Sequence, residues 1–220
     1  MNKSAILFPL LVATMISCNN TTNNGTTNTK KADSPAVAAA PVKETTPPPP
    51  PMDSATMMKN WQEYMTPGDM HKMLASYDGK WSGEITMWMD PSKPPTKNTC
   101  TSENKMIMGG HYQLSTNKGN FNGMPFEGIS TLGYDNAKKV FVNTWIDNMG
   151  SGIMYLEGPW DAATKTITLK GKCVDPMTGK DIEVRQTMKM IDDKNQLIEM
   201  YMIPANGKEY KSMEIKYTKK

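Results

Sequence analysis

FEGISTLGYDNAKKVFVNTWIDNMGSGIMYLEG, residues 126–158, is the stretch that decides the fold of this chain. It contains three runs in which apolar or aromatic side chains occupy about every second position, separated by short clusters of Asp, Asn and Gly. A period of two is typical of β-strands, and short clusters of turn residues are typical of hairpins. The stretch therefore predicts three antiparallel strands joined by two tight turns.

The middle strand of the three has two different faces, because side chains alternate across a strand. One face carries the apolar and β-branched residues Val140, Val142, Thr144 and Ile146. The other face mixes aromatic and polar groups, and we expect residues of neighbouring strands to extend it. The candidate ligand-binding residues are Trp88, Glu127, Phe141, Asn143, Trp145 and Asp147.

The same rhythm continues on both sides of this stretch. A first strand is predicted from Trp81 to Met89, and a loop is predicted from Asn117 to Gly123. The pattern predicts about ten antiparallel strands with hairpin-sized connections and no crossover helix. We expect an all-β, up-and-down barrel rather than a two-sheet sandwich, since a meander makes no Greek-key crossings and closure removes exposed edges.

Two short α-helices are predicted before the barrel. Asp53 or Ser54 can cap a helix that carries an apolar stripe through Met65. Thr66 as cap and Pro67 at the first helical position predict a second helix that ends near Ser76. We expect the helices to cover one mouth of the barrel or to pack on its wall.

The N-terminus has the features of a secretory signal peptide, residues 1–17, with Lys3 before an apolar segment that is too short to span a bilayer. Met15 to Cys18 resembles the bacterial lipobox, in which the cysteine is lipidated and becomes the new N-terminus. Residues 18–52 are rich in Thr, Asn and Pro and predict a disordered stalk, and residues 53–220 a single domain. We expect a lipoprotein of the bacterial cell envelope, anchored to a membrane through Cys18 and facing the periplasm or the exterior.

Composition argues against several classes of partner and reaction. The net charge of +3 comes almost entirely from lysine, with Arg185 as the single arginine, so no nucleic-acid partner is predicted. With only two histidines and no recognisable catalytic motif, the sequence predicts no enzyme and no cofactor. Carboxylates such as Glu127 and Asp147 are more often solvated than catalytic. Cys100 and Cys173 fall on strands that are not neighbours, so we expect both to be unpaired.

Methionine is unusually frequent, with 21 residues. Pairs such as Met87 and Met89 are predicted to place two thioethers on one strand face, and soft thioethers suit Cu(I). A Cu(I)-handling protein with ligands Met87 and Met89 is therefore one alternative. The favoured interpretation is that methionine replaces leucine as an adaptable core residue, with no metal site.

Several separated segments resemble the bacterial family known as domain of unknown function 1579. The resemblance extends from about Trp61 to the C-terminus, and its motifs are Thr66–Leu74, Gly79–Trp81, Met87–Pro91, Gly123–Gly128, Gly133–Asn136 and Thr144–Asp147. It implies a compact β-barrel-like domain that often occurs in exported bacterial proteins, and it implies no catalytic residue. A looser likeness to lipocalin-type and nitrobindin-type barrels depends on strand count alone, and fold does not give function.

The function predicted from the sequence is binding of a small, largely apolar ligand inside the barrel, without chemistry. The reason is that a closed barrel of this size encloses room for one small ligand. The alternative class is a structural or protein-interaction domain of the envelope, whose barrel centre is filled by side chains.

Overall fold

A computed structural model describes residues 52–121, 123–204 and 207–220 of the chain. The predicted signal peptide, Cys18 and the stalk up to residue 51 lie outside the described residues. Within the described ranges, none of the helices is both long enough and apolar enough to cross a membrane.

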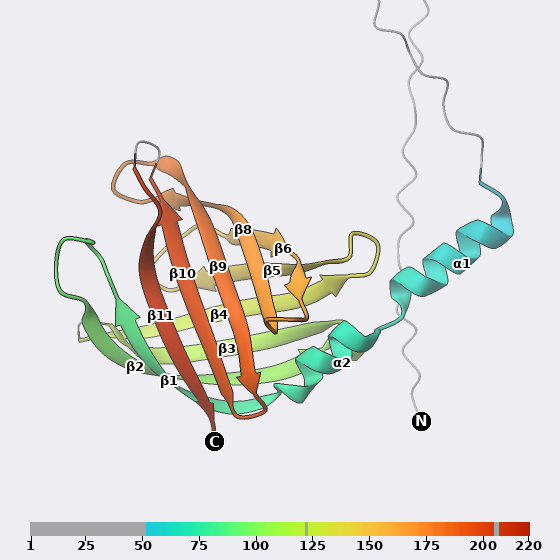
Figure 1. Cartoon of the computed structure of the whole chain (residues 1–220), viewed down its shortest axis with the longest axis horizontal. Helices are drawn as coiled ribbons and strands as arrows, with labels where there is room; N and C mark the ends of the chain where they lie inside the picture. The colour runs from blue at the N-terminus through green and yellow to red at the C-terminus, as the bar shows by residue number, and fades with distance from the viewer. Residues whose placement is uncertain (1–51, 122, 205–206) are drawn as a thin grey trace, which may run out of the picture. The chain divides into compact units, whose positions relative to one another are not determined.

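The described chain from Gly79 onward forms one closed antiparallel sheet (Figure 1). Strands β6 and β7 are separated at Pro159 and both pair with β8, so they form one interrupted strand of a ten-stranded barrel. Every other strand pairs with the next one along the chain, and β1 pairs with β11 to close the barrel. The predicted up-and-down barrel is therefore confirmed. The bounds are β1 Gly79–Met87, β2 Thr96–Ile107, β3 Tyr112–Phe121, β4 Met124–Asp135, β5 Val140–Asp147, β6 Met154–Gly158, β7 Trp160–Asp161, β8 Thr166–Asp175, β9 Lys180–Asp192, β10 Asn195–Ile203 and β11 Tyr210–Lys219.

Four of the hairpin turns share one local design. Each begins with an aspartate whose carboxylate accepts a hydrogen bond from the backbone N–H two residues later, which holds the turn without help from the rest of the fold. The pairs are Asp135 and Ala137 (2.8 Å), Asp161 and Ala163 (2.9 Å), Asp175 and Met177 (2.9 Å), and Asp192 and Lys194 (2.8 Å). The aspartate at the start of each of these turns is therefore a local reason why the preceding strand ends there.

The dry part of the core lies on the β5, β6 and β8 side of the barrel. Phe141, Leu156, Ile167 and Leu169 are all 0% exposed there. β6 and β8 approach closely at Gly158, where a Cβ atom would overlap the carbonyl oxygen of Thr168. This wall is thus filled by side chains and leaves little room for further atoms.

Two helices precede the barrel, as predicted: α1 (Ser54–Met65) and α2 (Asp69–Ser76). Asp53 caps α1 by accepting the N–H groups of Ala55 and Thr56, both at 3.0 Å. The predicted start of α2 was wrong. Thr66 donates its hydroxyl hydrogen to the carbonyl of Gln62 and so closes α1, and α2 begins at Asp69.

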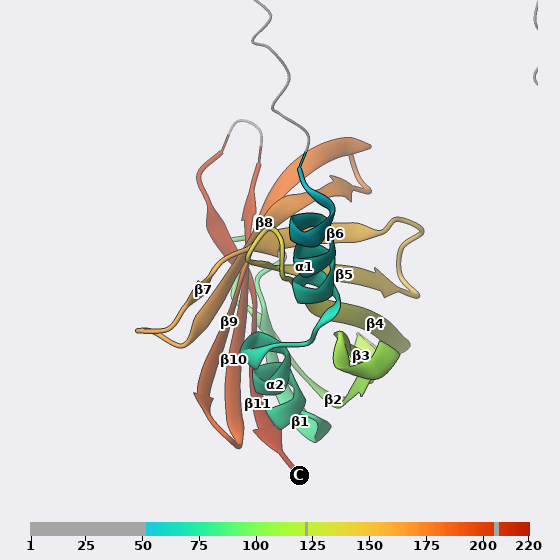
Figure 2. The same ribbon diagram turned by 90° about the vertical axis from the view of Figure 1, so that its right-hand side faces the viewer.

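The two helices have different relations to the barrel. α2 buries His71 and Leu74 and lies against β2, β3 and β4 at one end of the barrel (Figure 2). No residue of α1 is buried. The end of α1 is held by Asn136, whose Nδ2 donates to the carbonyl of Thr66 at 2.8 Å. The expectation that the helices cover a mouth of the barrel is therefore met by α2 alone.

Two predicted strand limits need correction. β3 continues to Phe121, through most of the predicted loop, because Asn117 pairs with Gly128 and turns its side chain into the barrel. β1 ends at Met87, two residues earlier than predicted, because the chain bends before the prolines that follow. Cys100 on β2 and Cys173 on β8 form no disulfide within the described part of the chain, in agreement with the prediction that they do not pair with each other.

Candidate functional site

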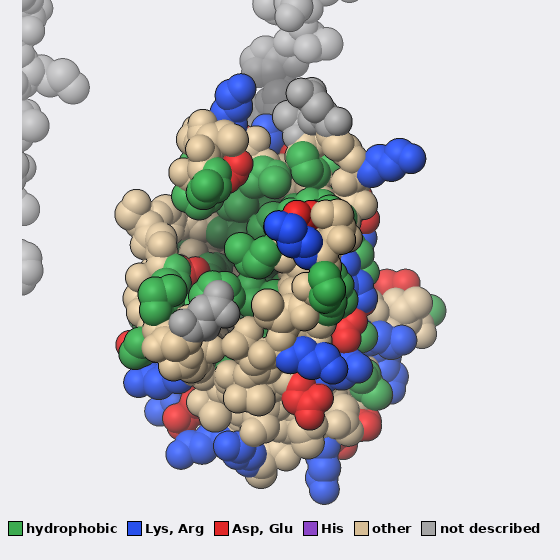
Figure 3. Space-filling model, turned by 90° about the vertical axis from the view of Figure 1, so that its left-hand side faces the viewer, with side chains coloured by type: hydrophobic (Ala, Val, Ile, Leu, Met, Phe, Trp, Pro, Cys, Tyr) green, Lys and Arg blue, Asp and Glu red, His purple; other side chains and the backbone are tan. Residues whose placement is uncertain are grey.

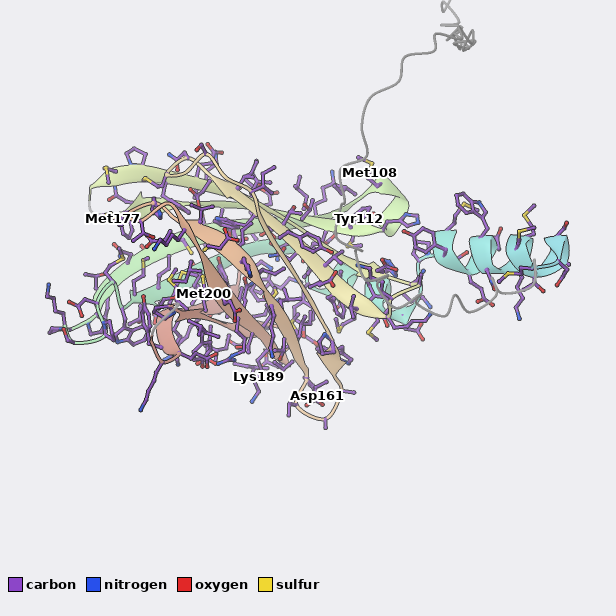
Figure 4. The ribbon with its side chains drawn as sticks, turned by 90° about the horizontal axis from the view of Figure 1, so that it is seen from above. Met108, Tyr112, Asp161, Met177, Lys189 and Met200 are labelled. Atoms are coloured by element: carbon purple, nitrogen blue, oxygen red, sulfur yellow. The ribbon has the colours of Figure 1, made fainter. Side chains whose placement is uncertain are left out.

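The barrel contains a cavity of about 300 Å³. It extends along the barrel axis from the floor beside α2 toward the opposite end, where Figure 3 shows a hollow bordered by hydrophobic side chains. Figure 4 places Met200 between the barrel walls, Met108 and Tyr112 near the helical end, and Met177 at the far end. Since this volume lies at the lower limit of ligand pockets, the cavity suits one small molecule.

The floor of the cavity is sealed by side chains that also hold α2. Trp81 is 1% exposed, and its indole N–H donates to the carbonyl of Tyr77 at 3.1 Å. Gln113 on β3 donates from Nε2 to the carbonyl of Leu74 at 2.7 Å. The Leu74 carbonyl also accepts the backbone N–H of Tyr77, the C-cap of α2, at 2.9 Å, so both side chains bind the chain where the helix ends. The helix end and the cavity floor are thus one unit.

One wall of the cavity carries a buried hydrogen-bonded group. The Tyr217 hydroxyl donates to Oδ1 of Asn117 at 3.1 Å and accepts from the Cys100 thiol at 3.6 Å. A side chain at Gly83 would collide with both Cys100 and Tyr217, so glycine is required there. Burial raises the pKa of the Tyr217 phenol and of the Cys100 thiol, so both stay protonated and neutral near pH 7.

A second polar cluster lies beside the first and connects β2 to β3. Ser115 donates to Oδ1 of Asn104 at 2.7 Å and shares a hydrogen bond of 2.9 Å with Ser102. Asn104 in turn donates to the carbonyl of Tyr77 at 3.3 Å. Asn98, nearer the open end, has a buried Nδ2 with no hydrogen-bond partner among the described residues. Apart from Asn98, these polar groups bind one another and hold the wall in place.

Aromatic rings and one carboxylate lie at the far end of the cavity. Phe141, near the start of β5, contacts Tyr134, and Tyr134 in turn contacts His71 of α2 edge to face. The start of β5 therefore lies at the end of the barrel that α2 covers. Asp147 lies six residues further along β5, about 20 Å at the rise of a strand. Its Oδ2 accepts the indole N–H of Trp145 at 2.7 Å, and its Oδ1 accepts the backbone N–H of Met149 at 2.9 Å. Asp147 is therefore held in one orientation at the rim.

Methionines line much of the opposite wall. Met87 on β1 lies directly opposite Met213 on β11, which lies directly opposite Met200 on β10. Cβ atoms of such pairs are about 4.5–5.5 Å apart. The other methionines that line the cavity are Met154, Met188 and Met190.

The predicted site residues divide between the cavity and other places. Asn143, Trp145 and Asp147 line the cavity, and Asn143 accepts a hydrogen bond from Ser130 at 2.6 Å. Phe141 shares their face, as predicted, but is fully buried in the dry core.

Trp88 and Glu127 lie away from the cavity. Glu127 precedes Gly128, the residue opposite Asp147, so its side chain turns to the other face, where it pairs with Lys118 at 3.3 Å. Trp88 follows the end of β1 and lies 5.9 Å from the ammonium of Lys211. Of the predicted methionine pair, Met87 lines the cavity, whereas Met89 is 71% exposed. The pair does not share a strand face, because β1 ends between them.

Sequence reasoning missed most of the polar wall. Tyr217, Asn117 and Gln113 were not among the predicted site residues. Gln113, Ser115 and Asn117 alternate along one strand, and a run of polar residues with a period of two is the signal that indicates a polar inner face.

The two histidines have structural partners at the helical end. Nδ1 of His71 accepts the N–H of Gly68 at 3.0 Å, and burial lowers the pKa of His71. Nε2 of His111 lies 2.8 Å from the carbonyl of Met65, which ties the end of α1 to the barrel. Within the described ranges, His, Cys, Asp and Glu side chains form no group of three that could hold a metal ion.

Solved structures resemble the chain in fold. The chain is similar in structure to Rv2717c from M. tuberculosis, with a TM-score of 0.55 and 12% identity over 70% of this chain and 99% of that one. At this identity the similarity concerns the fold alone. A redesigned β-barrel matches with a TM-score of 0.37 and 9% identity over 67% of this chain and 94% of that one.

Comparison of sequences identifies the family. No curated protein matches the chain. The family model described as "Protein of unknown function (DUF1579)" matches residues 66–219, which include α2 and the whole barrel. The chain therefore belongs to the DUF1579 family.

Proposed function

We propose that this protein binds a small, largely apolar molecule inside the barrel and performs no reaction on it. The observation that carries the proposal is the cavity of about 300 Å³, sealed by Trp81 at one end and lined by apolar side chains together with a few fixed polar groups. Such a combination is typical of small-molecule sites, in which the apolar lining supplies affinity and the polar groups orient the ligand.

Binding without chemistry agrees with the state of the polar wall. The Cys100 thiol and the Tyr217 hydroxyl hydrogen-bond each other, and burial raises the pKa of both groups. A thiol with a raised pKa is a poor nucleophile, since the thiolate is the reactive form. We therefore expect the Cys100 thiol and the Tyr217 hydroxyl to shape the cavity and to orient the ligand.

Filling the cavity should abolish binding. Met154 lines the cavity directly opposite Trp145, so Met154→Trp places a bulky ring in the ligand volume. We expect its affinity for dodecanol, measured by isothermal titration calorimetry on the full chain carrying Cys18→Ala, to fall by more than about tenfold. Circular dichroism should remain that of a β-barrel.

The matched control is Tyr155→Trp. Tyr155 is the next residue on β6, is 47% exposed and points away from the cavity, so this variant should bind dodecanol as the parent does. If the parent binds neither dodecanol nor any other apolar probe, the carrier proposal is wrong and the structural or protein-interaction alternative takes its place.

Native mass spectrometry separates the carrier from a second candidate, a Cu(I)-handling protein. The row of Met87, Met213 and Met200 places three thioethers on adjacent strands, and thioethers are ligands for Cu(I). A retained organic mass supports the carrier proposal. A mass increase of one copper ion after exposure to Cu(I), lost in Met213→Leu, would favour the copper candidate.

We also propose that the protein is anchored to a membrane of the bacterial cell envelope through a lipid on Cys18. The proposal depends on the lipobox-like run that ends at Cys18. Acyl chains on this cysteine would hold the protein on the membrane, because each buried methylene contributes about 0.8 kcal/mol to membrane binding. Cys18→Ala should move the protein from the membrane fraction to the soluble exported fraction. Unchanged membrane association of this variant would contradict the anchor.

A further inference from the structure

The cavity has one charged side chain among the described residues that line it, and that side chain is Asp147. Its other polar groups are amides, hydroxyls, one thiol and the Trp indoles. The Tyr217 phenol and the Cys100 thiol add no charge near pH 7, because burial raises the pKa of both groups. No lysine, arginine or histidine lines the cavity within the described ranges. A bound ligand therefore meets a single, negative charge.

Asp147 has no cationic partner among the described residues. Its carboxylate accepts N–H groups of Trp145 and Met149 and takes part in no salt bridge there. Lys118, which lies opposite Glu127 on the neighbouring strand, is bound to that carboxylate on the outer face at 3.3 Å. Each carboxylate oxygen accepts one hydrogen bond and retains acceptor capacity for a ligand.

Two aromatic rings lie beside this carboxylate. Trp145 and Phe126 stack with a centroid distance of 6.2 Å and an interplanar angle of 19°. The indole of Trp145 covers Gly128, since a Cβ atom at Gly128 would overlap the ring. Gly128 is directly opposite Asp147, so the ring and the carboxylate occupy the same part of the rim. An aromatic face next to a carboxylate is a favourable environment for an organic cation.

We propose that the ligand is an apolar molecule that carries a protonated amine or a quaternary ammonium group. The inference rests on the proposed carrier function and names its ligand class. The apolar part lies among the methionines, and the cationic group lies against Asp147, Trp145 and Phe126. A carboxylate in the same place would be repelled by Asp147 and would find no basic side chain. Fatty acids are therefore the wrong class for this cavity.

Three probes with a twelve-carbon chain test the charge preference: dodecyltrimethylammonium, dodecanol and dodecanoate. Each probe is titrated into the full chain carrying Cys18→Ala, with calorimetry as the readout and the quenching of Trp fluorescence as a second one. The two charged probes stay below their critical micelle concentrations, and dodecanol stays below its solubility limit. We expect the ammonium probe to bind about tenfold more tightly than dodecanol, and dodecanoate more weakly than both.

Asp147→Asn removes the charge and keeps the shape of the side chain. In this variant we expect the tenfold preference for the ammonium probe to fall to about twofold, while the affinity for dodecanol stays unchanged. The matched control is Glu127→Gln, which removes a carboxylate from the neighbouring strand on the outer face and should keep the full preference.

The outcomes separate this inference from the function on which it rests. Binding of none of the three probes overturns the carrier proposal itself. Equal binding of all three, tighter binding of dodecanoate, or an unchanged preference in Asp147→Asn overturns the cationic ligand class while the carrier proposal stands.

Discussion

Trp81→Ala is expected to lower the free energy of unfolding by about 3–5 kcal/mol. Trp81 is 1% exposed, stacks on Tyr77 with a centroid distance of 6.0 Å, and donates its indole N–H to the Tyr77 carbonyl. Its removal leaves a large hole in the floor and frees the end of α2. The loss therefore combines an empty volume, a missing hydrogen bond and a weakened helix contact.

Urea denaturation of the full chain carrying Cys18→Ala measures this effect, with far-ultraviolet circular dichroism as the signal because the substitution removes a tryptophan. Trp61→Ala is the matched control. Trp61 is on α1 and is 58% exposed, so its replacement should change the free energy of unfolding by less than about 0.5 kcal/mol. Equal losses for the two variants would mean that Trp81 does not hold the floor.

The second large effect is expected at the seam between β6 and β8. Gly158 is buried, and a Cβ atom there would overlap the carbonyl oxygen of Thr168 on β8. Gly158→Ala must push the two strands apart, which strains the wall and weakens the pairing that completes the barrel. We expect a loss of about 3 kcal/mol in the free energy of unfolding.

Gly152→Ala provides the control, because a Cβ atom at Gly152 meets no atom within 4 Å. Both variants are compared in the same urea titration, and both add a single methyl group. A small effect for Gly152→Ala beside a large one for Gly158→Ala assigns the loss to the seam. If Gly158→Ala is as stable as the parent, β6 and β8 do not approach as closely as described.

The all-β fold could be predicted from local signals. Alternation of side chains marked the strands, and aspartates such as Asp135 and Asp161 marked hairpin turns that they hold with their own carboxylates. The largest failure in a strand limit occurred where a distant contact overrides a local signal. The stretch that begins at Asn117 has the composition of a loop, yet pairing with β4 makes it a strand.

The candidate site could be predicted only in part. The alternation placed Asn143, Trp145 and Asp147 on one face, and all three line the cavity. The alternation could not separate these three residues from Phe141, which shares their face of β5 but is fully buried where β5 contacts β8. Glu127 was assigned to the site because it lies on the neighbouring predicted strand, whereas the register of β4 and β5 turns its side chain outward.

The sequence by itself determined the type of most elements, the hairpin turns that begin with aspartate and the residues that share a face within β5, because these depend on neighbours in the chain. Only the tertiary structure decided which faces enclose a cavity and which are packed solid. Tyr217 meets Cys100 and Asn117 across separations of 117 and 100 residues. Closure of β1 on β11 creates such contacts, since the strand register and the shape of the opposite wall are set by pairing and not by local sequence.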